Sequence, residues 1–370
     1  MAFDRRTFIK GAGSAALAAG TLSGIAFAEE ATAPAASDAP SWLGTEPEVA
    51  EADITDTKET TLLIVGAGTA GLACAATALD MGLDFFLAEK LPVISESREY
   101  MGAVNTQLIK DAGIEADTGM LLNELSRYAS GKCDRDLIKM WIDESAEAVE
   151  WYTPMFNAVG EAVMLPDYGG EEQGGTLYYS PVTEHMSGTA YIPPTRNEVI
   201  CNHITDNGGV VNFDYEMVKL VHEDGKVTGA VFNTDDGCVQ VNAKYTVLAC
   251  GGSAANPEMM QAWTRVEDYA YSSWWNPAWG TTGDGHMMGL AIGAQMDPIP
   301  HPVMNFRWGT PDSFADFRTW TAIYLGILVN GRGKRFVRED APFQAVSNAQ
   351  NAQPGYGKNC WYIFDEGMIT

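Results

Sequence analysis

The sequence predicts an α/β fold in which a parallel sheet with covering helices is joined to a β-meander. Residues 61–65 read TLLIV, an apolar, β-branched run typical of a strand buried on both faces. A glycine-rich turn and an Ala- and Leu-rich helix, residues 72 to about 81, follow it. Residues 210–243 alternate apolar and polar positions around two Asp-Gly turns, which indicates three antiparallel strands. Residues 245–250, YTVLAC, then predict another buried strand that runs into a Gly-Gly pair.

The N-terminus has the composition of an export signal. An arginine pair at residues 5–6 precedes a short apolar stretch rich in Gly and Ala, and Ala-Phe-Ala at 26–28 supplies a small-x-small cleavage site. The paired arginines favour the twin-arginine (Tat) route. We therefore expect residues 1–28 to be a Tat signal peptide and residues 29–58, rich in Ala, Pro and acid, to be a flexible linker.

Charge and cysteine content exclude several classes of function. The formal net charge is −26, which would repel a phosphate backbone, so we expect no binding of nucleic acid. The six cysteines are widely scattered, without a C-x-x-C or C-x-x-C-H pattern. We therefore expect no c-type haem, no iron–sulfur cluster and no zinc site in this chain.

The turn after the first strand follows the pattern G-x-G-x-x-G, and Glu89 closes the next predicted strand. This motif between a strand and a helix predicts a dinucleotide site. Gly66 would allow the tight turn, Gly68 the close approach of a pyrophosphate, and Gly71 the packing of helix on strand. The N-terminus of the helix favours phosphate, and Glu89 would accept hydrogen bonds from a ribose diol.

Helical periodicity dominates from about residue 107 to 159, and Asp134 is a candidate N-cap there. Residues 161–195 are rich in Gly, Pro and Tyr, so we expect them to be irregular. Residues 197–207 predict one more helix.

Five blocks resemble the FAD-binding flavoproteins of the fumarate reductase and succinate dehydrogenase family, especially its soluble flavocytochrome and ketosteroid dehydrogenase branches. They are LLIVGAGTAGLACAA, FFLAEK, AKYTVLACGGSAAN, TTGDGHMMGLAIGAQMD and ILVNGRGKRFVRED. The resemblance covers residues 61 to about 366. It implies a Rossmann-like, two-dinucleotide-binding FAD domain with a β-meander over residues 59–296, and a partial α+β clamp domain over residues 297–370.

The resemblance also implies FAD as the cofactor and a set of contacts to it. By position these contacts are Gly66, Gly68, Ala70, Gly71, Glu89, Lys90, Ser97, Arg98, Gly102, Ala103, Val218, Gly251, Gly252 and Asp284. Asp284 has a second candidate role as the N-cap of the helix that follows it. No histidine lies between Glu89 and Gly102, so we expect FAD to be bound non-covalently.

The catalytic residues of the resembling family are matched only in part. His301 falls where fumarate reductases place a histidine that binds a substrate carboxylate, although it also reads as an ordinary loop residue between two prolines. The position of the proton-donating arginine falls near Phe343, and the relay positions fall on Thr319 and Ala322. Because none of these side chains delivers a proton, we expect a substrate other than fumarate.

Tryptophans gather around the boundary between the two predicted domains, where they would form either a wall for a polycyclic substrate or part of the core. They are Trp263, Trp274, Trp275, Trp279, Trp308 and Trp320.

The N-terminal signal predicts an exported, extracytoplasmic protein, and the resemblance implies an oxidoreductase of anaerobic respiration that transfers hydride between FAD and an activated carbon–carbon double bond. Its partners would be a small unsaturated molecule and a separate cytochrome or membrane-bound electron donor. One alternative is a ketosteroid-type 1,2-dehydrogenase. The family continues beyond the clamp, so the other alternative is a truncated protein that binds flavin or a partner without catalysis.

Overall fold

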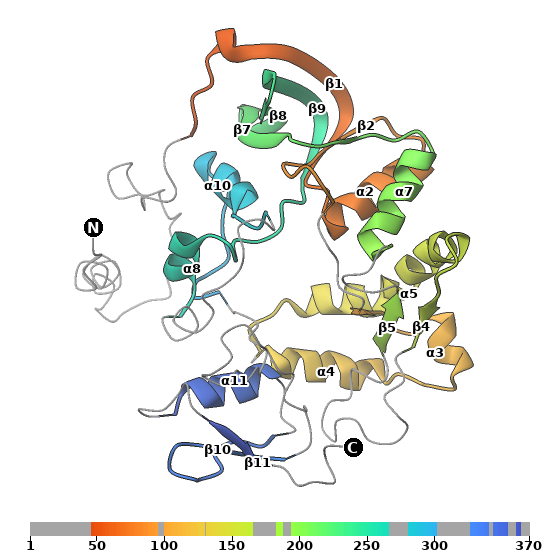
Figure 1. The fold of residues 1–370 in the computed structure, drawn as a ribbon, viewed down its shortest axis with the longest axis vertical. Coiled ribbons are helices and arrows are strands. Elements are labelled where there is room, and N and C mark those ends of the chain that lie inside the picture. Colours follow the sequence, from red (N-terminus) through yellow and green to blue (C-terminus); the bar gives the residue numbers. More distant parts are fainter. Residues whose placement is uncertain are drawn as a thin grey trace, which may run out of the picture. The chain divides into compact units, whose positions relative to one another are not determined.

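The computed structural model describes nine parts of the chain (Figure 1). They are residues 46–94, 100–129, 131–165, 183–187, 194–265, 280–301, 326–339, 343–353 and 360–363. The predicted signal peptide lies outside these parts, as do the predicted contacts Ser97 and Arg98 and every tryptophan of the predicted cluster except Trp263.

A six-stranded sheet with the order β6-β2-β1-β9-β8-β7 organises the described chain. Its strands are β1 (Ile54–Val65), β2 (Phe85–Ala88), β6 (Val211–Asn212), β7 (Glu216–Glu223), β8 (Lys226–Thr234) and β9 (Gly237–Leu248). Neighbours among β6, β2, β1 and β9 are parallel, whereas β9, β8 and β7 are antiparallel. The α/β fold with a parallel sheet and a meander is therefore confirmed.

Three boundaries differ from the expectation. Strand β1 begins at Ile54, so the last five residues of the predicted linker belong to the sheet. The third meander strand and the predicted strand at 245–250 are one strand, β9, which runs alongside β1 for its whole length. Residues 211–212 form β6, which pairs with β2 and not with the meander.

Apolar side chains cover the two faces of the sheet in separate clusters. On one face Ile64 and Leu87 pack against Leu72 of α2 (Thr69–Asp80) and Ile204 of α7 (Arg196–Asp206). Figure 1 shows α2 and α7 side by side. The other face carries Leu63, Val65, Phe232 and their neighbours. The two clusters bury the carboxyl ends of β1 and β2 from both sides, as an apolar run predicts. The prediction of a buried strand at 245–250 was wrong for Tyr245, Val247 and Leu248, which are exposed on β9.

Helices and a small sheet are inserted between β2 and α7. The helices are α3 (Gln107–Asp111), α4 (Thr118–Tyr128) and α5 (Arg135–Ala158), and Asp134 caps α5 as predicted, through its Oδ1, 2.9 Å from the Asp136 amide. Strands β3 (Tyr100–Gly102), β4 (Val163–Met164) and β5 (Glu184–Ser187) pair antiparallel in the order β3-β5-β4. The prediction that residues 161–195 are irregular was therefore wrong for β4 and β5.

The remaining elements are η1 (Glu51–Asp53), α8 (Pro257–Trp263), α10 (Asp284–Ala291), β10 (Ile327–Val329), α11 (Phe343–Asn351) and β11 (Trp361–Ile363). In the predicted clamp region β10 pairs antiparallel with β11. The buried Glu339 carboxylate accepts a hydrogen bond from the Leu328 amide at 2.8 Å and binds the Arg335 guanidinium. Across the described ranges, no helix is both long and apolar enough to span a bilayer.

Candidate functional site

The carboxyl ends of three parallel strands meet at one edge of the large sheet. Val65 of β1 lies opposite Ala88 of β2 on one side and Leu248 of β9 on the other. The chain leaves these strands into the glycine turn, Glu89 and the Gly251-Gly252 pair, respectively. This is the edge at which open α/β sheets bind ligands.

At two positions the glycine turn is packed so closely that a side chain is excluded. Gly66 has φ +101°, and a Cβ there would lie 2.5 Å from the Ala249 carbonyl oxygen. A Cβ on Gly71 would lie 1.8 Å from the Gly66 carbonyl oxygen, so the helix and the turn touch at this point. The roles expected of these two glycines in turning and packing match the geometry.

Helix α2 presents its N-terminus at the same edge. Gly68 is the N-cap, with φ −74° and ψ −174°, and no side chain among the described residues caps it. Ala70, in the first turn, is exposed. The helix has 12 residues, so its first amides and its dipole provide a site for an anion such as a diphosphate.

Asn197, which the sequence analysis did not single out, also holds this turn. It is fully buried at the start of α7, and the Thr69 hydroxyl donates to its Oδ1 at 3.0 Å. The contact joins residues 128 positions apart, and no local sequence signal marks it.

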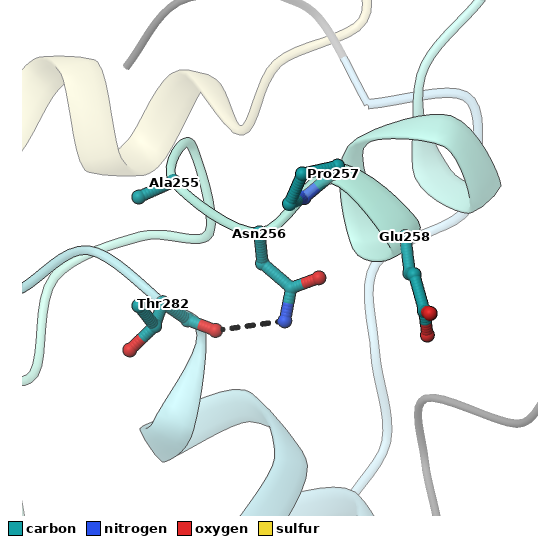
Figure 2. A pocket seen from close by; sticks show the side chains of 5 residues that line it. All are labelled: Ala255, Asn256, Pro257, Glu258 and Thr282. Carbon is teal, nitrogen blue, oxygen red and sulfur yellow. Dashed lines mark hydrogen bonds between the residues drawn. The ribbon is translucent and has the colours of Figure 1, made fainter. Parts of the chain in front are cut away.

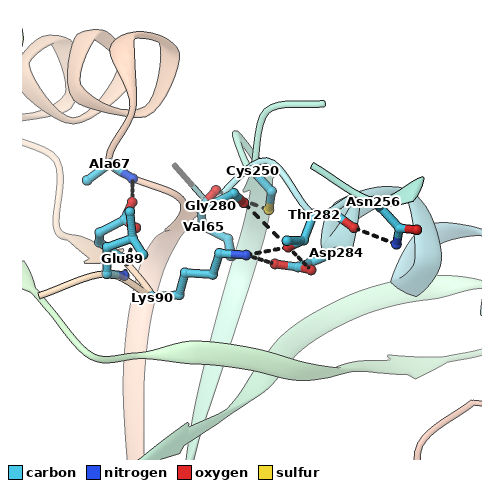
Figure 3. A network of polar contacts seen from close by, with 10 residues as sticks. Val65, Ala67, Glu89, Lys90, Cys250, Asn256, Gly280, Thr282 and Asp284 are labelled. Carbon is cyan, nitrogen blue, oxygen red and sulfur yellow. Dashed lines mark hydrogen bonds and ion pairs between the residues drawn. The ribbon is translucent and has the colours of Figure 1, made fainter. Parts of the chain in front are cut away.

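Glu89 lies beneath the glycine turn and is 7% exposed. Its Oε2 accepts a hydrogen bond from the Ala67 amide at 2.7 Å, and its Oε1 accepts one from the Leu91 amide at 2.9 Å (Figure 3). A carboxylate has about four acceptor positions, so the pair of backbone bonds leaves capacity for a ribose diol.

Lys90 and Asp284 form an ion pair beside this carboxylate (Figure 3). Lys90 Nζ lies 2.6 Å from Asp284 Oδ2 and 2.5 Å from the Thr282 hydroxyl, which donates to Asp284 Oδ1 at 2.7 Å. The predicted N-cap role of Asp284 was wrong, because Gly283, with φ +84°, is the N-cap of α10 and Asp284 turns to Lys90 instead. Thr282 was missed as a member of this group, although it lies in the T-G-D-G block.

Cys250 follows β9 at the same edge of the sheet. Its Sγ donates to the Val65 carbonyl at 3.5 Å, and burial, followed by the negative charge of Asp284, raises the pKa of its thiol to about 11. The thiol therefore stays protonated at neutral pH and is a packing group, not a nucleophile.

The other predicted contacts lie on neighbouring segments. Gly251 has φ +71°, and the Gly252 carbonyl accepts from the Gly283 amide at 3.1 Å, which ties the Gly-Gly pair to α10. Val218 is the extra residue of a bulge in β7, between Met217 and Lys219. A bulge leaves its extra residue outside the ladder, so the backbone there is not used by β8. Gly102 and Ala103 lie at the end of β3, in the small sheet.

His301 packs against Trp263 and is distant in sequence from the glycine turn. Its ring centroid is 5.6 Å from that of Trp263, and its Nε2 donates to the Asp297 carbonyl at 3.1 Å. His286 contacts the same indole at 5.5 Å. Trp263 is 4% exposed, so core packing is confirmed for this one tryptophan of the predicted cluster.

A pocket of about 500 Å³ adjoins the Lys90 group and is lined by Ala255, Asn256, Pro257, Glu258 and Thr282 (Figure 2). The side-chain amide of Asn256 donates through Nδ2 to the Thr282 carbonyl at 3.0 Å, which fixes one wall of the pocket. The described residues contain no group of three or more His, Cys, Asp or Glu that could hold a metal ion.

Together, a turn that leaves no room for a Cβ at Gly66 or Gly71, a helix N-terminus without a side-chain cap and the buried Glu89 fit the diphosphate and ribose of a dinucleotide. The family model described as "FAD binding domain" matches residues 61–368.

The curated proteins to which this chain is similar include reductases. The chain is 28% identical over 316 residues to a probable fumarate reductase of Shewanella frigidimarina, a match that covers 84% of this chain and 51% of that protein. It is 27% identical over 331 residues to a urocanate reductase of Eggerthella lenta, again covering 84% of this chain and 51% of the relative. The chain thus spans about half the length of these relatives.

Solved structures share the fold. An open flavocytochrome c3 fumarate reductase superposes with a TM-score of 0.61 at 24% identity, covering 86% of this chain and 54% of that one. A 3-ketosteroid-Δ4-(5α)-dehydrogenase from Rhodococcus jostii superposes with a TM-score of 0.63 at 20% identity, covering 87% and 69%.

Proposed function

Because the chain belongs to the FAD binding domain family, in its fumarate reductase-like branch, we propose that it is an oxidoreductase acting on an activated carbon–carbon double bond. FAD is its cofactor. The observation that carries the proposal is the glycine turn closed against the ends of β1 and β9, with Glu89 beneath it. When bound, FAD supplies the hydride chemistry of its isoalloxazine ring.

The chain's own residues would hold the cofactor without a covalent bond. The amides at the start of α2 would bind the diphosphate, where Gly68 admits close approach. Glu89 would accept from the ribose diol while it keeps the turn in place through Ala67. The bulged backbone at Val218 would offer its hydrogen-bonding groups to the adenine end.

The substrate is proposed to be an enoate or enone other than fumarate. By the sequence resemblance, the position of the proton-donating arginine of fumarate reductases falls near Phe343, the first residue of α11. His301 is the proposed contact to an electron-withdrawing group of the substrate, through its Nδ1, which has no partner among the described residues. Because Nε2 already donates to the Asp297 carbonyl, Nδ1 would donate to a substrate oxygen only when the ring carries both protons. We further propose Tat export from residues 1–28 and electron delivery by a separate cytochrome or membrane donor.

The first experiment asks whether the purified chain carries FAD. We expect a yellow protein that absorbs at about 450 nm. Acid precipitation should release the flavin, because it is not covalently attached. A Gly68→Val variant keeps an ordinary backbone conformation, with φ −74°, but fills the approach to the diphosphate, so it should lose the flavin while its far-UV circular dichroism is retained. Flavin retained by this variant at the unsubstituted level would contradict the proposed site.

The second experiment separates reduction from the two alternatives. A chemically reduced donor would be offered with fumarate, cinnamate-like acids and steroid enones, and the reverse reaction with saturated 3-ketosteroids and an artificial acceptor. Oxidation of the donor that depends on an added enoate or enone supports the proposal. Dehydrogenation of saturated 3-ketosteroids alone supports the ketosteroid-type alternative. A flavin-loaded chain that turns over no compound supports a binding protein without catalysis.

A further inference from the structure

The segment of residues 102–106, which joins β3 to α3, is hydrogen-bonded to α5 at two positions. The Gly102 carbonyl accepts from the Trp141 indole at 3.1 Å, and the Val104 amide donates to Ser145 Oγ at 2.9 Å. Both partners lie on α5. A Cβ on Gly102 would lie 3.0 Å from Cζ2 of Trp141, so the strand end rests directly on this ring.

His185 holds the same residues from the side of β5. The side chain is fully buried, and its Nδ1 lies 2.8 Å from the Thr183 carbonyl oxygen. That oxygen also accepts from the Ala103 amide at 2.8 Å. Because a carbonyl only accepts, Nδ1 of His185 carries the hydrogen.

The other ring nitrogen reaches the far end of the segment. Nε2 of His185 lies 2.7 Å from Oγ1 of Thr106, which caps α3 by accepting from the Ile109 amide at 3.3 Å. With Nδ1 protonated and the ring neutral, Nε2 is an acceptor and the Thr106 hydroxyl donates to it. Burial lowers the pKa of His185 below its ordinary value, in keeping with a neutral ring.

The segment between these two anchors is only partly exposed to solvent. Ala103, Val104 and Thr106 are buried, whereas Gly102 is exposed and Asn105 is half-buried. Asn105 has φ +59°, a left-handed conformation that persists in a non-glycine residue when its surroundings fix it. The imidazole therefore links the two ends of a short, strained turn.

We propose that His185 is a positioning residue that, by joining Thr183 to Thr106, fixes the segment Gly102–Thr106 in the conformation that receives the flavin. The inference rests on the proposed function, because Gly102 and Ala103 are among the proposed FAD contacts. Nothing in the arrangement requires His185 to touch the cofactor.

The test measures FAD dissociation constants and the visible circular dichroism of bound flavin in the unsubstituted chain and in variants. His185→Leu keeps the bulk and removes both hydrogen bonds, so we expect about a tenfold weaker FAD affinity and an altered flavin dichroism band. His185→Asn retains a donor toward Thr183 and should restore part of the affinity. His203→Leu is the matched control, since His203 bonds Asp80 on α2, outside the segment, and should leave the flavin band unchanged.

Thr106→Val is the second test, and it tests the positioning role of His185 if His185→Leu fails to fold. It removes the hydroxyl at constant shape, so affinity should fall and the dichroism band should change in the same direction. A variant that folds, loses thermal stability and keeps both the dissociation constant and the band would overturn the positioning role. If the unsubstituted chain binds no FAD, the proposed function itself fails, which is a different result from unchanged flavin signals in the variants.

Discussion

Lys90 Nζ lies 2.6 Å from Asp284 Oδ2, which joins the end of β2 to the start of α10 across 194 residues of sequence. Both side chains are about one-fifth exposed, 20% and 18%, so neither charge is fully solvated. The Thr282 hydroxyl bridges the two groups. The ion pair therefore fastens the segment before α10 to the nucleotide edge of the sheet.

Asp284→Ala should destabilise this edge more than Asp284→Asn. Alanine leaves the Lys90 ammonium without its carboxylate, which we expect to lower the free energy of unfolding by about 1–3 kcal/mol, whereas asparagine still accepts from it. Urea unfolding and FAD titration measure the two effects. A double-mutant cycle with Lys90→Met isolates the pair, and a coupling energy of zero would contradict it.

Gly71→Ala tests the contact between helix and turn. Its Cβ would lie 1.8 Å from the Gly66 carbonyl oxygen, so the turn must move, and we expect a loss of at least about 2 kcal/mol in unfolding free energy together with loss of FAD. Gly289→Ala is the matched control. It lies within α10, where its Cβ would be 3.6 Å from the Ala294 Cβ, so helix propensity should stabilise it by about 0.5–1 kcal/mol. Equal effects of the two substitutions would argue against the close packing at Gly71.

His301 and His286 form a matched pair, because both rings contact Trp263. If His301 binds a substrate carboxylate or carbonyl, His301→Ala should raise KM about tenfold or more with an active enoate, while His286→Ala changes it little. Steady-state kinetics with the best substrate from the panel provides the comparison. Similar KM values for the two variants would remove His301 from the proposed substrate site.

His185 should make stability depend on pH. Its pKa is lowered by burial from the ordinary value of 6.5, so the unfolded chain takes up the proton more readily than the folded chain. The stabilisation is complete above pH 6.5 and is lost as the pH falls from there toward the folded-state pKa, with a slope of at most about 1.4 kcal/mol per pH unit. Urea unfolding from pH 8 to pH 5 measures this slope. Carboxylates contribute to the same range, so the informative quantity is the difference from His185→Gln, which should have the shallower dependence.

The parts of the fold that depend on local pattern could be predicted from the sequence. The strand, the glycine turn and Glu89 follow one another within 30 residues, and each has a local signature. Asp134 could be recognised as an N-cap for the same reason. The resemblance then supplied Lys90 and Asp284, although their direct contact depends on tertiary packing that no short window of sequence contains.

The predictions that were wrong or incomplete have a common physical origin. Residues 55–58 carry exposed polar and charged side chains because β2 pairs with β1 only from Leu62 onward. Their composition is therefore that of a linker, although this part of β1 pairs with β9. The pairing of β9 with β8 stops at Asn242, and the sequence pattern of β9 changes from alternating to mostly apolar soon after it, so the strand was divided in two. The His185 contacts link segments about 80 residues apart, beyond the reach of periodicity.

Strand β9 belongs to two substructures at once. Its first half is the last strand of the meander, and its second half borders the glycine turn, while β1 accompanies it from Cys238 to Leu248. Opening the turn by fraying β1 from β9 would therefore also expose meander amides, so the two regions should behave as a single foldon. A ligand held only at the turn would slow hydrogen exchange in β8, far from any atom it contacts.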